Sequence, residues 1–233
     1  MKSADNTSLL PEVVVNFAVT WDGRISTRNR TRADFSSPHD KHRLLEIRAS
    51  GDAVLVGRGT LEIEQMRMGI PDPALQAERV TRGLPPEPLR VVVSNSGAFA
   101  PAARLFEKDP ARTILFASSQ MPQATRDALE GKATLHLTES PHVDLRAMLQ
   151  ILRSRYGVRR LVCEGGPTLL RSLLVENLVD EINLTFCPRV FGGADAPTLT
   201  GVPGAFLPSA IECKLEEMEN TNDGECFTRY RVL

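Results

Sequence analysis

The residues best suited to chemistry follow short apolar runs, and the segment from Glu164 to Thr168 (EGGPT) is the clearest case. It lies between an apolar run at residues 160–163 and an expected helix that begins at Pro167. Paired glycines let a ligand approach the backbone closely, and the free N–H groups of a helix start can bind a phosphate. The segment therefore predicts a phosphate-binding turn, although Gly-Gly-Pro also suits a plain tight turn.

Three other expected strand ends carry small polar residues, at 57–60 (GRGT), 94–97 (SNSG) and 117–119 (ASS). Ligands of open α/β sheets bind at the carboxyl ends of the strands. Four polar strand ends therefore predict an extended polar ligand, such as a dinucleotide, across this edge of the sheet. The sequence has neither GxGxxG nor GxxxxGK[ST], which argues against a standard Rossmann domain and a P-loop NTPase.

The cysteines and histidines form no metal-binding pattern. The cysteines are Cys163, Cys187, Cys213 and Cys226, without a CxxC pair, and three of them fall in apolar strand-like runs. His39 and His42 share one expected helix face but have no third ligand nearby. We therefore expect reduced thiols and no metal site.

Strand and helix patterns alternate along the chain. Ser37-Pro38 begins one helix as N-cap and first-turn proline, and Gly157 ends another. Residues 160–187 predict a βαβ unit with parallel pairing, and residues 221–224 (TNDG) predict a hairpin turn. The expected strands are residues 13–19, 53–57, 89–93, 113–116, 134–137, 160–163, 180–187, 210–219 and 225–232, and the expected helices are residues 38–49, 123–129, 144–156 and 167–177.

These patterns predict an α/β fold with a mixed, mostly parallel sheet of about nine strands, helices on both faces and a C-terminal antiparallel hairpin. The proline-rich segment at residues 61–88 is too long to be a plain linker. The arginine-rich loop at residues 24–32 is expected to be a flap over an anionic substrate, because aromatic residues for nucleic-acid binding are not interleaved with it.

Composition limits the classes of partner. The chain has 233 residues, 42% of them hydrophobic, which is enough for a sizeable core and excludes disorder as the overall state. Its 28 Lys and Arg against 29 Asp and Glu leave a net charge of −1, so we expect no nucleic-acid or membrane partner. The polar N-terminus lacks the pattern of a secretory signal, and a cytoplasmic protein is expected.

An ordered set of motifs resembles the reductase family of riboflavin biosynthesis, which has a dihydrofolate reductase-like three-layer fold. In bacteria this reductase is the C-terminal domain of a bifunctional deaminase-reductase, and here it resembles a free-standing form. We expect a loosely ordered segment at 1–12 and one reductase domain at 13–233. The motifs are VTWDGR at 19–24, SP at 37–38, LEIRA at 45–49, DAVLVG at 52–57 with Thr60, LRVVV at 89–93 and EGGPTL at 164–169.

The resemblance implies an NADPH-dependent enzyme, usually homodimeric, that reduces the ribosyl group of a 5-amino-6-(5-phosphoribosylamino)pyrimidine to ribityl. It implies substrate contacts at Arg48 and Glu164, and we add Leu75 and Arg79 as substrate-binding candidates. The cofactor-binding candidates are Ala18, Thr60, Glu64, Asn95, Gly165, Gly166, Pro167, Thr168 and Leu169.

The sequence departs from the family on the substrate side. An aspartate pair precedes Pro-x-Leu in the family, whereas here Glu64 holds the first position and Asp72-Pro73-Ala74-Leu75 follows late. Glu64 and Asp72 are the candidates for relaying a proton to an imine form of the substrate. The alternatives are a dihydrofolate reductase-like enzyme acting on a pterin or another small imine or carbonyl compound, and an inactive nucleotide-binding relative.

Overall fold

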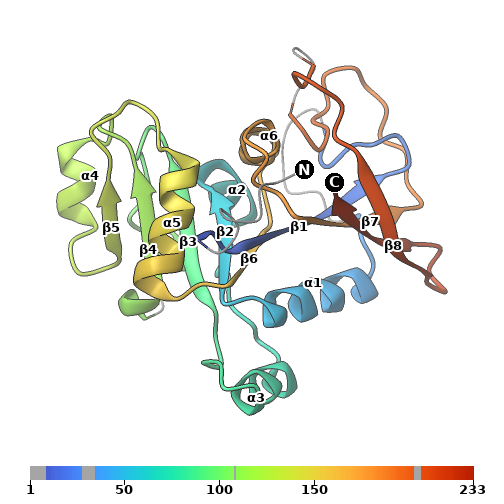
Figure 1. Ribbon diagram of the computed structural model, residues 1–233, viewed down its shortest axis with the longest axis horizontal. Helices are drawn as coiled ribbons and strands as arrows, with labels where there is room; N and C mark the ends of the chain where they lie inside the picture. The colour runs from blue at the N-terminus through green and yellow to red at the C-terminus, as the bar shows by residue number, and fades with distance from the viewer. Residues whose placement is uncertain (1–8, 28–34, 108, 202–205) are drawn as a thin grey trace.

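The computed structural model describes residues 9–27, 35–107, 109–201 and 206–233, and its described strands form one nine-stranded sheet. The strand order is β5-β4-β3-β2-β6-β1-β7-β9-β8, parallel from β5 to β7 and antiparallel from β7 to β8 (Figure 1). The strands are β1 (Glu12–Thr20), β2 (Ala53–Gly57), β3 (Leu89–Ser94), β4 (Thr113–Ala117), β5 (Thr134–Leu137), β6 (Arg160–Cys163), β7 (Glu181–Cys187), β8 (Cys213–Asn220) and β9 (Cys226–Val232).

Local capping residues set where the helices begin and end. Ser37 caps α1 by accepting a hydrogen bond from the backbone N–H of Asp40, and Gly157 ends α5 in the left-handed conformation with φ of +67°. The helices are α1 (Pro38–Ser50), α2 (Arg58–Glu64), α3 (Pro73–Thr81), α4 (Gln123–Ala128), α5 (Leu145–Tyr156) and α6 (Pro167–Val175), with 3₁₀ turns at Arg104–Glu107 and Pro110–Arg112.

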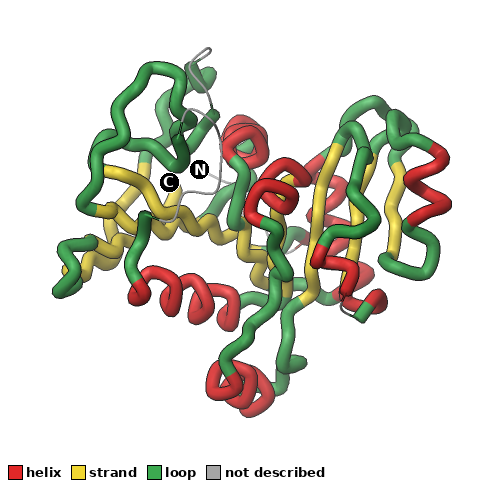
Figure 2. Tube along the Cα trace, turned by 180° about the vertical axis from the view of Figure 1, so that it is seen from behind, coloured by secondary structure: helices red, strands yellow, loops and turns green. Residues whose placement is uncertain are grey.

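Helices cover both faces of the sheet, and alternate strand residues pack against each layer. On one face, α5 and α6 contribute leucines such as Leu149 and Leu173 to a cluster that includes Leu55 of β2. On the other face, Val54 and Val56 of the same strand pack with Leu61 of α2. Figures 1 and 2 show α1 and α6 on opposite sides of β1. The expected three-layer α/β fold with its C-terminal antiparallel hairpin is confirmed.

The expected direct pairing within residues 160–187 is wrong. β6 and β7 run in the same direction, but β1 lies between them and pairs with both. The β-branched residues of β1, among them Val13, Val14 and Val15, are buried on both sides, as a central parallel strand requires. The connection through α6 therefore crosses over one strand, and Gly165 at its start lies against the Phe17 ring of β1.

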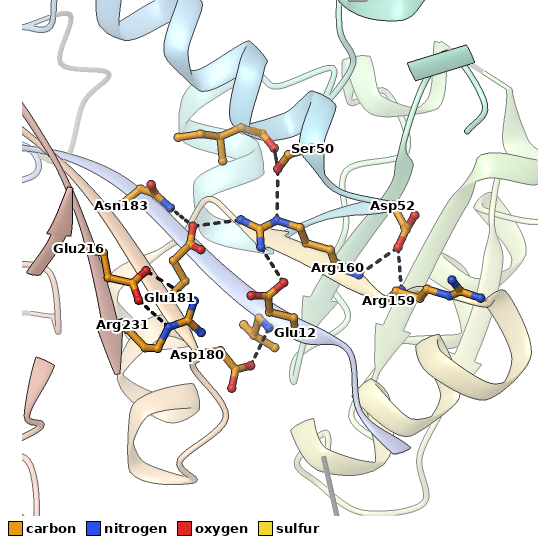
Figure 3. Close-up of polar contacts among 12 residues, drawn as sticks. Glu12, Ser50, Asp52, Arg159, Arg160, Asp180, Glu181, Asn183, Glu216 and Arg231 are labelled. Carbon is orange, nitrogen blue, oxygen red and sulfur yellow. Dashed lines mark hydrogen bonds and ion pairs between the residues drawn. The ribbon is translucent and has the colours of Figure 1, made fainter. Parts of the chain in front are cut away.

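A polar network joins the amino ends of these three strands, opposite the edge where chemistry is expected (Figure 3). The Arg160 guanidinium donates from Nη1 to Glu12 at 2.6 Å and from Nη2 to Glu181 at 3.0 Å. The buried Glu181 carboxylate also accepts from Asn183 at 2.8 Å. Because Arg160 lies on β6, Glu12 on β1 and Glu181 on β7, this network fixes the strand starts relative to one another.

Several segments differ from expectation. The proline-rich connection contains α2 and α3. Pro73 begins α3, at a position where the missing N–H group of a proline costs nothing. All eight residues of β8 are exposed, so Cys213 is not in an apolar strand core. Residues 1–8 of the expected loose segment lie outside the described residues, whereas Leu10 packs on the core and Glu12 already begins β1.

Candidate active site

A cavity of about 890 Å³ lies at the carboxyl ends of β1, β2 and β6, between α1, α2 and α6. Its size matches that of small-molecule sites, and its position agrees with the rule for open α/β sheets. Of the predicted site residues, the cavity is lined by Ala18, Arg48, Thr60, Glu64, Glu164, Gly166, Pro167, Thr168 and Leu169.

Backbone segments approach closely where β2 and β6 end. The Gly57 N–H donates to the Gly165 carbonyl at 2.7 Å. A Cβ placed on Gly166 would lie 2.6 Å from the Thr60 hydroxyl oxygen, which is closer than real Cβ atoms come. Gly165 has φ of +116°, a conformation that side chains other than glycine rarely adopt. Only glycines therefore allow this turn to form the cavity wall beside Thr60.

The N-terminus of α6 opens onto the same wall. Gly166 is its N-cap and makes no side-chain capping bond, and Pro167 follows at the first position. Thr168 and Leu169, in the first turn, line the cavity. Backbone N–H groups of a helix start and the helix dipole favour an anion at such a position. The geometry therefore fits a phosphate-bearing ligand here.

Arg48 and Glu164 form a buried ion pair in the cavity wall. Arg48 donates from Nε to Glu164 Oε1 at 2.6 Å and from Nη2 to Oε2 at 2.7 Å, while its Nη1 donates to the Gly69 carbonyl at 2.8 Å. Their side chains are 9% and 4% exposed. Burial lowers the pKa of Arg48, but the Glu164 carboxylate, with a smaller contribution from Glu87, more than offsets this and leaves that pKa raised. The two residues predicted to contact the substrate therefore form an ion pair with each other.

Five predicted site residues are not among those lining the cavity. Gly165 lies directly behind it, with its carbonyl bonded to Gly57. Arg79 is fully buried and donates to the backbone carbonyls of residues 49, 51 and 85, so it braces the chain. Leu75 packs in a small core cluster. The Asp72 carboxylate caps α3, and Asn95 accepts from the Val143 N–H at 2.9 Å.

The expectation that four polar strand ends share one ligand stays a prediction for two of them. The cavity reaches the ends of β1, β2 and β6, whereas no residue from 94–97 or 117–119 lines it. Ser94 Oγ accepts from the Gly97 N–H at 3.1 Å, and the Ser118 hydroxyl donates to the Asn95 carbonyl. Their own side chains thus stabilise these two turns. Of the expected arginine-rich flap, residues 28–34 lie outside the described residues, while Ser26 lines the cavity.

Sequence reasoning missed Asp40, which lies in the first turn of α1 and lines the cavity. The Thr185 and Ser36 side chains favour the charged form of its carboxylate. Burial, with a smaller contribution from the nearby Glu225 carboxylate, raises the pKa of Asp40. In the sequence this aspartate looks like an ordinary helix-start acid, and its position one turn before Leu44 was the only signal of a cavity-facing role.

In the part of the chain that the structure describes, no group of three or more His, Cys, Asp or Glu side chains could hold a metal. No described helix is long and apolar enough to cross a membrane. The cytoplasmic location stays a prediction.

Comparison with known proteins decides the family. Residues 11–227 match the RibD C-terminal domain. The chain belongs to the RibD C-terminal domain family. It is 35% identical over 94% of its length to the 2,5-diamino-6-ribosylamino-4(3H)-pyrimidinone 5′-phosphate reductase of Archaeoglobus fulgidus, and the match covers 97% of that protein. It is 34% identical over 88% of its length to the reductase of the same name from Methanothermobacter thermautotrophicus, covering 91% of that protein.

Solved structures of this family share the fold. A pyrimidine reductase-like protein from Corynebacterium diphtheriae superposes with a TM-score of 0.82 at 19% identity, over 100% of this chain and 96% of that one. RibD of Acinetobacter baumannii gives a TM-score of 0.79 at 19% identity, over 97% of this chain and 59% of that one. The resemblance inferred from the sequence motifs is therefore confirmed, and the fold is that of the RibD reductase domain.

Proposed function

We propose that this chain is an NADPH-dependent reductase that converts the ribosyl group of 2,5-diamino-6-ribosylamino-4(3H)-pyrimidinone 5′-phosphate to ribityl. The observation that carries the proposal is the cavity, whose wall combines a glycine turn at a helix start with a buried Arg48–Glu164 pair. Both archaeal reductases described above bear that substrate in their names and match the chain along most of its length. The riboflavin-biosynthesis role follows from the family.

NADPH fits the wall formed by Thr60 and the start of α6. The space beside Thr60 exists only because Gly166 lacks a side chain, and the α6 N-terminus is not capped by its own residues. Backbone N–H groups near Thr168 would hold the phosphates, and Ala18 at the end of β1 would contact the cofactor alongside them. When bound, NADPH supplies the hydride for reduction. The protein contributes orientation and exclusion of water.

The remaining wall of the cavity suits the substrate. Arg48 and Glu164 are fixed by each other, so their remaining N–H and lone-pair positions are presented to a ligand in one geometry. Glu64 lines the cavity and remains the candidate for moving a proton to the substrate nitrogen. Asp72 is a poorer candidate, because its carboxylate caps α3 outside the cavity.

The test is oxidation of NADPH, followed by absorbance, with the diamino substrate prepared enzymatically. We expect turnover that depends on both compounds, and a product that has gained two hydrogen atoms by mass spectrometry. Dihydrofolate and an omitted substrate serve as controls. Tight NADPH binding without turnover of the pyrimidine, or turnover of dihydrofolate in its place, would reject this substrate.

The exposed edge strand β8 supports a homodimer. All its residues are exposed, among them Leu215 and Met218 at 46% and 59%. An unpaired edge with apolar side chains is a template for pairing with another chain. We expect light scattering to give twice the 25.6 kDa chain mass, and Leu215→Lys to give a monomer. Val80→Lys changes a comparably exposed residue on α3 and should leave the dimer intact; equal behaviour of both variants would place the interface elsewhere.

A further inference from the structure

The substrate of the proposed reaction carries a phosphate group with a charge of about −1.5 to −2 at pH 7. Such a group is bound most strongly by cations that no acid neutralises. Arg48 is not such a cation, because Glu164 neutralises it in the cavity wall. Arg79 is fully buried and donates to backbone carbonyls, so it is closed to a ligand. The neutral Arg48–Glu164 pair suits an uncharged polar edge of the pyrimidine, and the phosphate must be bound by other residues.

Two further arginines, Arg67 and Arg104, line the cavity at its solvent-exposed rim. Arg67 belongs to the segment between α2 and α3, and Arg104 begins the 3₁₀ turn that Glu107 ends. The Arg67 Nη2 donates to Glu107 Oε2 at 2.9 Å, and the two side chains are 51% and 52% exposed. Side chains three residues apart in a 3₁₀ turn lie on the same face. The bond from Arg67 to Glu107 therefore brings Arg67 and Arg104 together, and these three residues form the rim cluster.

The rim cluster carries one positive charge in excess, because it holds two arginines and one glutamate. Arg104 is the cation that no acid neutralises: among the described residues, its exposed guanidinium takes part in no hydrogen bond or ion pair. A guanidinium presents its N–H donors in a planar fork that fits two oxygens of a phosphate. The rim cluster therefore offers free donors and positive charge to an anion that enters the cavity.

The rim cluster is connected to the wall that suits the substrate. Two residues beyond Arg67, the Gly69 carbonyl accepts from Arg48 Nη1 at 2.8 Å. The anion site that fits the cofactor phosphates lies on a different element, at the start of α6 beside Thr60. Two anionic ligands that bind at the same time repel each other unless their charges are held apart. Separate anion sites on α6 and in the rim cluster meet this requirement.

We propose that Arg104, together with Arg67, binds the 5′-phosphate of the substrate and makes this reductase selective for the phosphorylated pyrimidine over its ribosyl nucleoside. This inference rests on the proposed function and assigns the phosphate of that substrate to the rim cluster. Glu107 competes with the phosphate for Arg67, since both present oxygen acceptors to the same guanidinium. The rim is exposed, so salt screens the attraction, and substrate binding should weaken as ionic strength rises.

The deciding variant is Arg104→Gln, measured with the phosphorylated pyrimidine and with the nucleoside that a phosphatase makes from it. We expect KM for the phosphorylated pyrimidine to rise by about 10- to 100-fold, the usual effect of losing a charge-assisted hydrogen bond, with little change in kcat. The nucleoside should react with the same low kcat/KM in wild type and variant, because it has no phosphate for Arg104 to bind. Glu107→Gln frees Arg67 from its acid and should lower KM for the phosphorylated pyrimidine by about 2- to 5-fold.

The controls separate a local effect of Arg104 from a change in net charge. Arg153→Gln removes one positive charge from α5, outside the cavity lining, and should leave KM unchanged. Calorimetric titration with the phosphorylated pyrimidine, without NADPH, should rank the dissociation constants of the variants in the same order as KM. The ratio of kcat/KM for NADPH to that for NADH should be the same in wild type and Arg104→Gln.

The outcomes also separate this inference from the proposed function. If wild type neither binds nor reduces the phosphorylated pyrimidine, the proposed function fails and this inference fails with it. If wild type reduces it, but Arg104→Gln affects the phosphorylated pyrimidine and the nucleoside equally or not at all, the rim cluster does not bind the phosphate. A loss in Arg104→Gln that is confined to NADPH would assign Arg104 to the 2′-phosphate of the cofactor and overturn the proposal.

Discussion

The Arg48–Glu164 pair allows stability and function to be separated by a double-mutant cycle. The two side chains are 9% and 4% exposed and share two hydrogen bonds of 2.6 and 2.7 Å, so solvent screens their attraction very little. Removing one partner of such a pair leaves a buried charge without compensation, which costs about 3–5 kcal/mol. We therefore expect Arg48→Met and Glu164→Met each to lower the free energy of unfolding by that amount.

The double variant is expected to recover most of this loss. Replacing both charged groups by apolar side chains of similar size is often close to neutral, because no unpaired charge remains. The Gly69 carbonyl still loses the Arg48 Nη1 donor, which costs about 1–2 kcal/mol. Urea unfolding followed by circular dichroism measures all four proteins. Single variants that each lose less than about 1 kcal/mol, and whose losses add, would refute the account of a buried and coupled pair.

The catalytic turnover of the four proteins in this cycle should not parallel their free energies of unfolding. Both side chains line the cavity, and the two methionines of the double variant present no N–H donors or carboxylate to the substrate. We expect the double variant to fold and to bind NADPH, yet to lose reduction of the pyrimidine. Wild-type turnover in the refolded double variant would show that the pair has a structural role only.

Three further predictions concern single residues. A thiol reagent should label the exposed Cys213 in the native protein, whereas Cys163, whose pKa burial raises to about 12, should react only after unfolding. Rapid labelling of Cys163 itself in the native protein, located by peptide mass spectrometry, would contradict this. The raised pKa of Asp40 means that the folded state favours its protonated carboxyl, and this contribution to stability is lost as the pH rises above the ordinary pKa of an aspartate, about 4. Asp40→Asn should therefore gain stability relative to wild type as the pH rises above about 4 in urea unfolding, and a difference that does not change with pH would contradict the effect of burial. Gly166→Ala should weaken NADPH binding by about 10-fold or more in fluorescence titration, because the added Cβ would lie 2.6 Å from the Thr60 hydroxyl oxygen. An unchanged Kd would show that the Thr60 side chain moves aside freely.

Local sequence patterns were sufficient for most strands and helices. Apolar β-branched runs such as 53–57, and capping residues such as Ser37 and Gly157, determine structure through neighbours in the chain. The position of β1 between β6 and β7 depends on contacts between distant segments, which no local pattern records. Helices α2 and α3 were missed because prolines and glycines surround them.

The same distinction holds for the candidate site. The turn at 164–168 was predictable because glycines and a helix start stand next to one another in the sequence. The pairing of Arg48 with Glu164 was not, since they are separated by 116 positions, although both were expected at the site. Arg79 was expected to bind the substrate, and only the fold shows its guanidinium bonded to backbone carbonyls. The place of Asp40 at the site could be recognised only from the cavity that it lines.

The most direct test of the central claim is the transfer of label from the cofactor to the substrate. Wild-type protein would be mixed with the diamino ribosylamino-pyrimidinone phosphate and NADPH that carries deuterium on the transferable position of its nicotinamide. We predict a product with one deuterium on the first carbon of the ribityl chain, located by mass spectrometry and NMR. Oxidation of NADPH without deuterium in the pyrimidine product, or no oxidation at all, would contradict the assignment of this cavity to reduction of the ribosyl group.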